Sequence, residues 1–175
     1  MTIDDVLPAW DWRSAHATRV AAPPERAADA VRTFNGRDLP VTGVLMRIRA
    51  LGRRTFDERP TIEAMSRIGL TTLADGPQGI VVGGVLSPWR LRGGHRRVAS
   101  AEEMRAFAEP GWVRVAAAFT VVPEGGGCRV ATETRIAATD DAARRRFGRY
   151  WRLVGPFSSI TRREMLAAIR RRAEA

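Results

Sequence analysis

Residues 112–138 read WVRVAAAFTVVPEGGGCRVATETRIAA, and this stretch decides the fold. It contains two strand-like runs, residues 112–122 and 128–138, on either side of a glycine-rich turn at 123–127. Alternate residues of the first run are apolar and share one face, as they do in a half-buried β-strand. The short connection between the runs therefore predicts an antiparallel β-hairpin.

The segment after the hairpin has the spacing of a long amphipathic helix that continues almost to the C-terminus. Either Thr139 or Asp140 is expected to cap its N-terminus, where acidic side chains also suit the helix dipole. The pair Gly155-Pro156 is expected to kink or break the helix, because proline lacks a backbone donor and clashes with the preceding turn. One side of the helix carries Ala143, Phe147, Tyr150, Trp151 and Val154, and the opposite side carries Arg144, Arg145, Arg146, Arg149 and Arg152.

The part of the chain before the hairpin predicts one strand, two short helices and several more antiparallel strands. Trp12–Val20 alternates as a strand does, and helix-start signals follow at Pro23 and Pro40. Residues 80–86 are apolar on both faces, which is typical of a central strand covered on two sides. A capping-box signal at Ser100 predicts a further short helix.

Composition is typical of a globular protein. Of the 175 residues 45% are hydrophobic and 27% are charged, and no run of about 18 apolar residues predicts a transmembrane helix. Residues 1–11 are expected to be a loosely held N-terminal tail without a signal peptide, and residues 12–173 a single domain. The net charge of +10 comes from arginine without any lysine, which indicates compositional bias rather than selection for phosphate contact. We expect a cytoplasmic protein.

Three local phrases, read together with this order of elements, resemble a known superfamily. They are GGVLSPWR at 83–90, ATETRI at 131–136 and FGRYW at 147–151. Over residues 12–172 the chain resembles the helix-grip superfamily of START domains, polyketide cyclases and birch-pollen-allergen-like proteins. Within that superfamily it is most similar to a bacterial branch whose function is unknown.

The resemblance implies an α+β helix-grip fold. In this fold a curved antiparallel sheet of about six or seven strands wraps around a long C-terminal helix, and two short helices follow the first strand. The resemblance also implies a cavity between sheet and helix that takes sterols, lipids, aromatic polyketides or similar compounds. Because one such fold hosts carriers, sensors, cyclases and dehydratases, the activity does not follow from it.

The predicted ligand pocket lies between the sheet and the terminal helix. Each of its residues also has a plainer interpretation as core, because aromatic side chains dominate core packing and threonines are good strand formers. The hydroxyl of Tyr150 would need a partner if buried and could orient a ligand, and Thr132 and Thr134 could add hydroxyls to a pocket wall. The predicted lining residues are Leu45, Met65, Val82, Trp89, Phe119, Thr132, Thr134, Phe147, Tyr150, Trp151 and Val154.

Three functions are open at this point. The leading hypothesis is a carrier or sensor of a small hydrophobic ligand, because an apolar sheet face and an aromatic helix stripe occur without a catalytic motif. The second is a cyclase- or dehydratase-like enzyme, which would need an acid or base inside the same cavity. The candidates for that role are Glu63, His16, Arg47 and Tyr150. The third is an interaction module that uses the sheet surface or the arginine-rich side of the helix.

The outer sheet surface is expected to carry Arg114, Glu133 and Arg135. We interpret them as an exposed row of ion pairs with little energetic weight. If a partner buries that face, the same residues would set the register of a homodimer.

Metal and cofactor chemistry is not indicated. His16 and His95 lack the spacing of metal ligands, and the single cysteine, Cys128, is interpreted as a small apolar filler. We therefore expect no metal, no cofactor, no nucleic-acid partner and no stable membrane insertion. The expected ligand is a small hydrophobic molecule.

Overall fold

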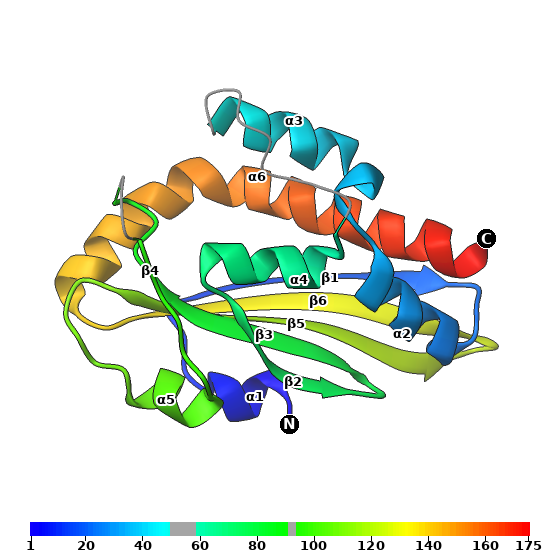
Figure 1. Cartoon of the computed structure of the whole chain (residues 1–175), viewed down its shortest axis with the longest axis horizontal. Helices are drawn as coiled ribbons and strands as arrows, with labels where there is room; N and C mark the ends of the chain where they lie inside the picture. Colours follow the sequence, from blue (N-terminus) through cyan, green and yellow to red (C-terminus); the bar gives the residue numbers. More distant parts are fainter. Residues whose placement is uncertain (50–58, 91–93) are drawn as a thin grey trace.

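The chain forms an α+β helix-grip fold, as the sequence predicted. The computed structural model describes residues 1–49, 59–90 and 94–175. A curved antiparallel sheet lies against one long C-terminal helix, with the short helices at its faces and edges (Figure 1). In chain order the elements are α1 (Ile3–Val6), β1 (Trp12–Val20), α2 (Pro24–Thr33), η1 (Gly36–Asp38), α3 (Pro40–Arg49), α4 (Thr61–Met65), η2 (Ser66–Ile68), β2 (Thr71–Gly76), β3 (Gly79–Leu86), β4 (His95–Arg96), α5 (Ala101–Ala106), β5 (Val113–Glu124), β6 (Gly127–Ala138) and α6 (Asp141–Glu174).

Within the described residues the sheet has six strands in the order β1-β6-β5-β3-β2, and the short β4 pairs with β3. Its centre is the predicted hairpin, in which β5 and β6 pair along their whole length. The turn is tighter than expected, because only Gly125 and Gly126 lie between the strands, with φ of 53° and 81°. Positive φ at both positions is the type I′ geometry that matches strand twist and favours glycine.

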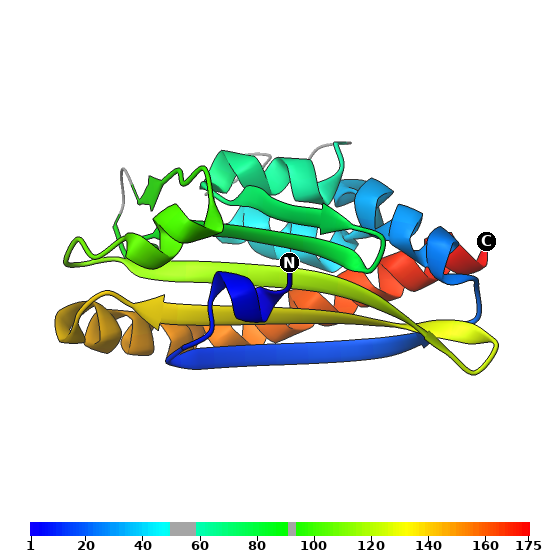
Figure 2. The same ribbon diagram turned by 90° about the horizontal axis from the view of Figure 1, so that it is seen from below.

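The two faces of the sheet are covered by different elements. Residues on one face pack with α2, α4 and α6, and residues on the other face pack with α1 and α5. Strand β3 contributes to both clusters, with Ile80 and Val82 in the first and Val81 and Val85 in the second, as predicted for a covered central strand. Figure 2 shows α1 and α5 in front of the strands and α6 behind them. We call the face toward α6 the inner face and the other the outer face.

Helix α6 is continuous over 34 residues. Its predicted cap is confirmed, because a carboxylate oxygen of Asp140 accepts a hydrogen bond from the backbone N–H of Ala143 at 2.8 Å. The helix does not break at Pro156 and instead bends between its N-terminal part and the remainder (Figure 1). A bend accommodates the proline ring and the missing N–H, and it lets α6 follow the curved sheet.

The N-terminal residues are not the loosely held tail that we expected. Helix α1 is a single turn, yet Ile3, Val6 and Leu7 are buried against the outer face. Helix α5 covers a neighbouring part of that face, and the predicted cap at Ser100 accepts from the backbone N–H of Glu103 at 3.0 Å. The three residues that pack, Ile3, Val6 and Leu7, were too sparse a pattern to predict this packing.

The expected surface row of ion pairs is also wrong at its central residue. The Arg135 side chain is only 6% exposed, because α1 lies over it. Its guanidinium contacts Glu133 at 2.7 Å and Asp4 at 2.7 Å, and donates to the carbonyl of Leu7 at 3.1 Å. Arg114 does not join this group and donates instead to a carbonyl of α5 at 2.9 Å. The outer face is therefore covered and internally paired around Arg135, whereas the outward side chains of β1 remain exposed.

Candidate functional site

The inner side of α6 packs tightly against the sheet at its two ends and less tightly in its middle. Near the N-terminal end Phe147 is 3% exposed, and the C-terminal part buries Met165, Leu166 and Ile169. Between these ends lies the middle span of α6, residues 150–162, where inward-facing side chains keep accessible surface. The partly buried residues of this span include Tyr150, Trp151, Val154, Ser158 and Arg162.

Phe147 is the centre of an aromatic cluster at the N-terminal end of the middle span. Its ring centroid lies 4.7 Å from that of Trp12, 5.5 Å from Trp151, 5.8 Å from Tyr150 and 6.4 Å from Trp89. The structure thus brings four predicted pocket residues together and adds Trp12, which the sequence analysis had not included. The indole N–H of Trp89 is buried and has no hydrogen-bond partner in the described part of the chain.

The other predicted apolar residues are more widely spread. Phe119 is fully buried on the inner face, and its ring meets that of Phe34 at 5.8 Å, apart from the aromatic cluster. Met65 on α4 and Val82 on β3 belong to the inner core. Leu45 is partly exposed on α3, which lies farther from the strands than α6 (Figure 1). Sequence spacing identified the helix stripe but not which short helix covers which part of the sheet.

A polar strip runs along β1 and β6 on the inner face. The strand register places Ser14 opposite Thr134 and His16 opposite Thr132. The two threonines are 5% and 1% exposed, and their hydroxyl oxygens have no hydrogen-bond partner among residues 1–49, 59–90 and 94–175. Buried hydroxyls are nearly always paired, so these two neighbours have hydrogen-bonding capacity that the fold does not use.

His16 is the titratable group of this strip. Its Nε2 lies 3.3 Å from the hydroxyl of Ser14. Burial lowers the pKa of His16, and the positive charges of Arg163 and Arg162 lower it further. The imidazole is therefore mostly neutral at pH 7 and can accept or donate a proton on the inner face.

Arg162 interrupts the apolar inner stripe of α6. It follows Ser158 by four residues and precedes Leu166 by four, so all three lie on one side of the helix. The residue is partly accessible, yet burial lowers the pKa of its guanidinium to about 10. Its Nη1 donates to the sulfur of Met165 at 3.9 Å, and no described carboxylate forms an ion pair with it. Arg162 was not among the residues predicted from the sequence, although helical steps of four, three and four residues from Trp151 lead to it.

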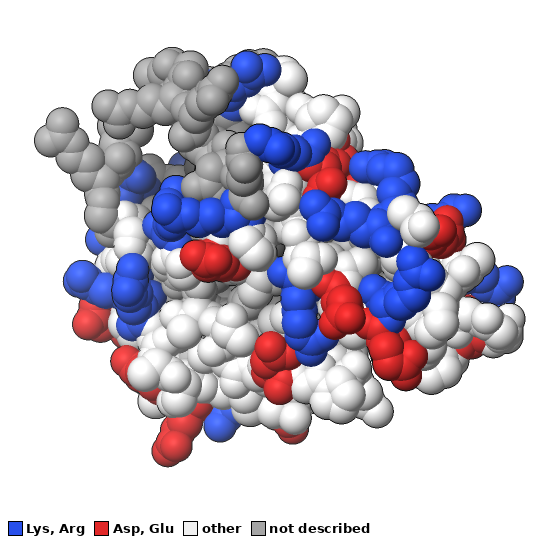
Figure 3. All heavy atoms as spheres, turned by 45° about the vertical axis from the view of Figure 1, so that its right-hand side comes forward, with Lys and Arg blue, Asp and Glu red and all other residues white. Residues whose placement is uncertain are grey.

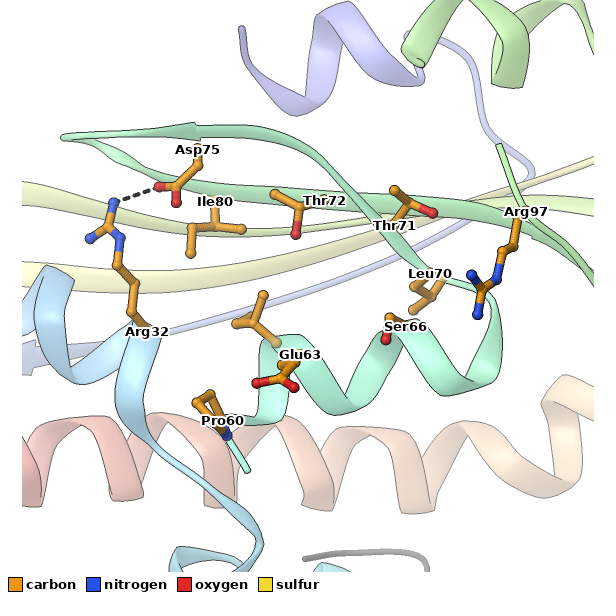
Figure 4. A pocket seen from close by; sticks show the side chains of 11 residues that line it. Arg32, Pro60, Glu63, Ser66, Leu70, Thr71, Thr72, Asp75, Ile80 and Arg97 are labelled. Atoms are coloured by element: carbon orange, nitrogen blue, oxygen red, sulfur yellow. Dashed lines mark hydrogen bonds and ion pairs between the residues drawn. The ribbon is translucent and has the colours of Figure 1, made fainter. Parts of the chain in front are cut away.

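An open pocket of about 580 Å³ lies elsewhere, between α4 and the β2 edge of the sheet (Figure 4). Its lining is mixed, with apolar, hydroxyl-bearing and charged side chains: Arg32, Pro60, Ile62, Glu63, Ser66, Leu70, Thr71, Thr72, Asp75, Ile80 and Arg97. Arg32 and Asp75 form an ion pair across it at 2.6 Å, and the exposed Glu63 points from α4. None of the predicted lining residues belongs to this pocket.

The four candidate acid–base residues do not form one constellation. His16 and Tyr150 both lie in the region between β1 and α6, whereas Glu63 lines the α4 pocket and Arg47 is exposed on α3. Cys128 is 1% exposed, and burial raises the pKa of its thiol, as expected of a core residue. In the described ranges no three His, Cys, Asp or Glu side chains come together as a metal site would require.

The molecular surface mixes charges of both signs. On the face drawn in Figure 3, basic and acidic side chains interleave. Exposed pairs of this kind include Arg170 with Glu174 at 3.1 Å and Arg172 with Asp38 at 2.8 Å. Among the described helices none combines the length and apolar character needed to cross a bilayer.

No family model and no curated protein matches the chain. Similar solved structures include TTHA0849 of Thermus thermophilus, with a TM-score of 0.36, 14% identity and coverage of 93% of this chain and 97% of that one. Truncated norcoclaurine synthase of Thalictrum flavum has a TM-score of 0.34 and 14% identity, and covers 91% of each chain. Ara h 8.0201 has a TM-score of 0.28, 7% identity and coverage of 90% and 97%. The class of this protein, an α+β helix-grip fold, rests on its own strand order and on α6.

Proposed function

We propose that the chain is a member of the helix-grip superfamily that binds a small hydrophobic ligand, as a carrier or sensor. The ligand would lie between the middle span of α6 and strands β1 and β6. Lipids, sterol-like compounds and aromatic polyketide-like compounds are the classes that the resemblance of the sequence suggests.

The observation that carries this proposal is the difference in side-chain burial between the two ends and the middle of the inner side of α6. Both ends are sealed by buried side chains, while Tyr150 and Trp151 between them keep accessible surface. On strand β6, which contacts α6, Thr132 and Thr134 hold buried hydroxyls without partners in the described part of the chain. Apolar and aromatic walls with a few unused polar groups are typical of a small-molecule site.

The pocket between α4 and β2 is a weaker candidate for this role. Its rim is charged and exposed, and Arg32 and Asp75 already satisfy each other. A hydrophobic ligand there would have to displace water from charged groups, which is costly.

Binding of 1-decanol, measured by the rise in melting temperature and by native mass spectrometry, tests the proposal. Ser158 lies on the inner side of α6, so Ser158→Phe should fill the site and abolish the rise. Ala167 is exposed on the same helix, so Ala167→Phe should bind 1-decanol as the wild type does. Far-UV circular dichroism checks that both variants fold. The absence of a shift in the wild type, or equal shifts in both variants, would contradict the proposal.

The position of His16 favours a second candidate, an acid–base enzyme of the cyclase or dehydratase type. A neutral imidazole on the inner face is the group that such chemistry needs inside the site. His16→Gln should then abolish conversion of a co-purified ligand, followed by mass spectrometry, while 1-decanol binding is unchanged. Recovery of the ligand unaltered from the wild type would remove this candidate.

A further inference from the structure

We propose that the ligand is acidic, with a carboxylate that pairs with Arg162 and an elongated apolar body that lies against the aromatic cluster. This inference rests on the proposed function, because it specifies the ligand of the same site. It is carried by three features: a partly buried guanidinium without an ion pair among the described residues, two buried hydroxyls without partners there, and an accessible aromatic wall.

Arg162 is a desolvated cation that the described part of the protein does not neutralise. The nearest acidic residue along the chain, Glu164, is occupied by α3, since its carboxylate accepts from the backbone N–H groups of Val41 and Thr42, each at 2.7 Å. The only hydrogen bond of the guanidinium within the described residues goes to the sulfur of Met165. A buried charge is costly unless it is paired. A ligand that carries a negative charge would therefore gain the interaction energy of an ion pair with Arg162.

The groups around Arg162 also favour an anion over a cation. His16 faces it from β1 and Arg163 adjoins it on α6, and both arginines act electrostatically on the imidazole. The hydroxyl of Thr132, opposite His16 in the strand register, is free to donate a hydrogen bond. Because Arg163 is exposed and screened by solvent, the site itself offers one guanidinium, that of Arg162, and a hydroxyl donor to a negative group.

The distance between the aromatic and cationic ends sets the shape of the ligand. Trp12 marks the aromatic end, because its ring lies 4.7 Å from that of Phe147, and His16 marks the cationic end. His16 lies four residue steps along β1 from Trp12, which at roughly 3.3 Å per step is about 13 Å. An extended amphiphile of this length can reach both ends at once.

A carboxylate fits the cationic end better than a phosphate does. One guanidinium balances one negative charge and offers two parallel N–H donors, which a carboxylate accepts in the same plane. A phosphate monoester carries nearly two charges at neutral pH and would remain half compensated. The proposal therefore commits to a monocarboxylic acid.

The test compares matched probes on the full chain at neutral pH by isothermal titration calorimetry. The probes are decanoate, 1-decanol, decylamine and acetate, and the proteins are wild type, Arg162→Met, Arg162→Lys and Arg163→Met. We expect the wild type to bind decanoate at least about tenfold more tightly than 1-decanol, because a desolvated charge-assisted pair forms. Arg162→Met should lose this preference and still bind 1-decanol, Arg162→Lys should keep part of it, and Arg163→Met should keep most of it.

A second readout separates pairing from a merely structural role of Arg162. Decanoate bound at Arg162 should raise the pKa of His16, followed by NMR, because it neutralises a charge that lowers that pKa. His95→Gln assigns the signal, since the chain has two histidines. 1-Decanol should leave this pKa nearly unchanged.

The outcomes distinguish the two proposals. Equal affinities of the wild type for decanoate and 1-decanol, or an acid preference that survives in Arg162→Met, would overturn the acidic ligand and leave hydrophobic binding intact. Acetate binding as tight as decanoate binding would also overturn it, by assigning Arg162 to a small free anion. If neither decanoate nor 1-decanol binds, the proposed function fails, and this inference fails with it.

Discussion

Two arginines on opposite faces of one sheet have opposite surroundings. Arg135 on the outer face contacts Glu133 and Asp4, each at 2.7 Å, and the carbonyl of Leu7. Its guanidinium carbon also lies 4.1 Å from the centroid of the Trp10 ring. Arg162 on the inner side has a single sulfur contact and, within the described residues, no ion pair.

The difference shows that this fold can satisfy a desolvated arginine completely where the arginine has a structural role. Arg135 ties α1 to the sheet and has every partner it needs. Arg162 has none of these partners. It lies on the same side of α6 as Ser158 and Leu166, where an apolar side chain could pack toward the core. An unpaired buried charge lowers stability, so its presence is explained more simply by a ligand than by packing.

Removing Arg135 should have the largest effect. Arg135→Met is expected to lower the free energy of unfolding by about 2–4 kcal/mol, because it leaves Glu133 less paired and releases α1 from the sheet. Urea denaturation measures the change. The control is Arg13→Met, which removes the half-exposed partner of the same glutamate and should lower stability clearly less than Arg135→Met does. Equal decreases in the free energy of unfolding of the two variants would mean that the burial of Arg135 does not contribute to stability.

Removing Arg162 should act in the opposite direction. Arg162→Met is expected to raise the free energy of unfolding of the ligand-free protein by about 1–3 kcal/mol, since it replaces an unpaired desolvated charge with an apolar side chain. The exposed neighbour provides the control, because Arg163→Met should change stability by less than about 0.5 kcal/mol. A clear loss of stability in Arg162→Met, in urea denaturation without ligand, would show that the guanidinium has a structural partner.

A smaller effect is expected in the pH dependence of stability. The folded state lowers the pKa of His16, so the unfolded chain takes up this proton first as the pH falls below about 6.5. The free energy of unfolding should therefore decrease between pH 7 and pH 5, and His16→Gln should flatten that slope. In NMR titrations Arg162→Met should raise the pKa of His16, and Arg135→Met should leave it unchanged. A slope that is the same with and without His16 would contradict the lowered pKa.

The smallest expected effect is the coupling between the two arginines. They lie on opposite sides of the sheet and share no partner in the contacts given above. The double variant Arg135→Met/Arg162→Met should therefore change stability by the sum of the single changes, within about 0.5 kcal/mol. A larger interaction energy from urea denaturation would show that the two faces are not independent.

The hairpin and α6 could be predicted from sequence because their signals are local. Alternation along 112–122 and 128–138 fixed the strands, and the spacing of Phe147 and Trp151 fixed the inward side of α6. Pro156 was expected to kink or break the helix, and the structure has a bend, since tertiary packing on both sides holds the chain helical.

The two arginines could not be distinguished from sequence because burial depends on contacts between distant segments. Arg135 is buried by α1, which lies more than a hundred residues away along the chain. Arg162 is one of 29 basic residues and is followed by another arginine, so its residue type did not distinguish it from the others. Helical spacing counted from Trp151 was the available signal for Arg162. It places the residue on the inward side of α6, but it does not show that the guanidinium lacks an ion-pair partner.

A crystal structure of the protein with decanoate tests the central claim most directly. The account predicts the carboxylate within about 3 Å of the Arg162 guanidinium. It also predicts the alkyl chain along β1, against Phe147 and Trp151. Decanoate bound only in the pocket between α4 and β2, or a middle span of α6 closed against the sheet with decanoate elsewhere, would contradict it.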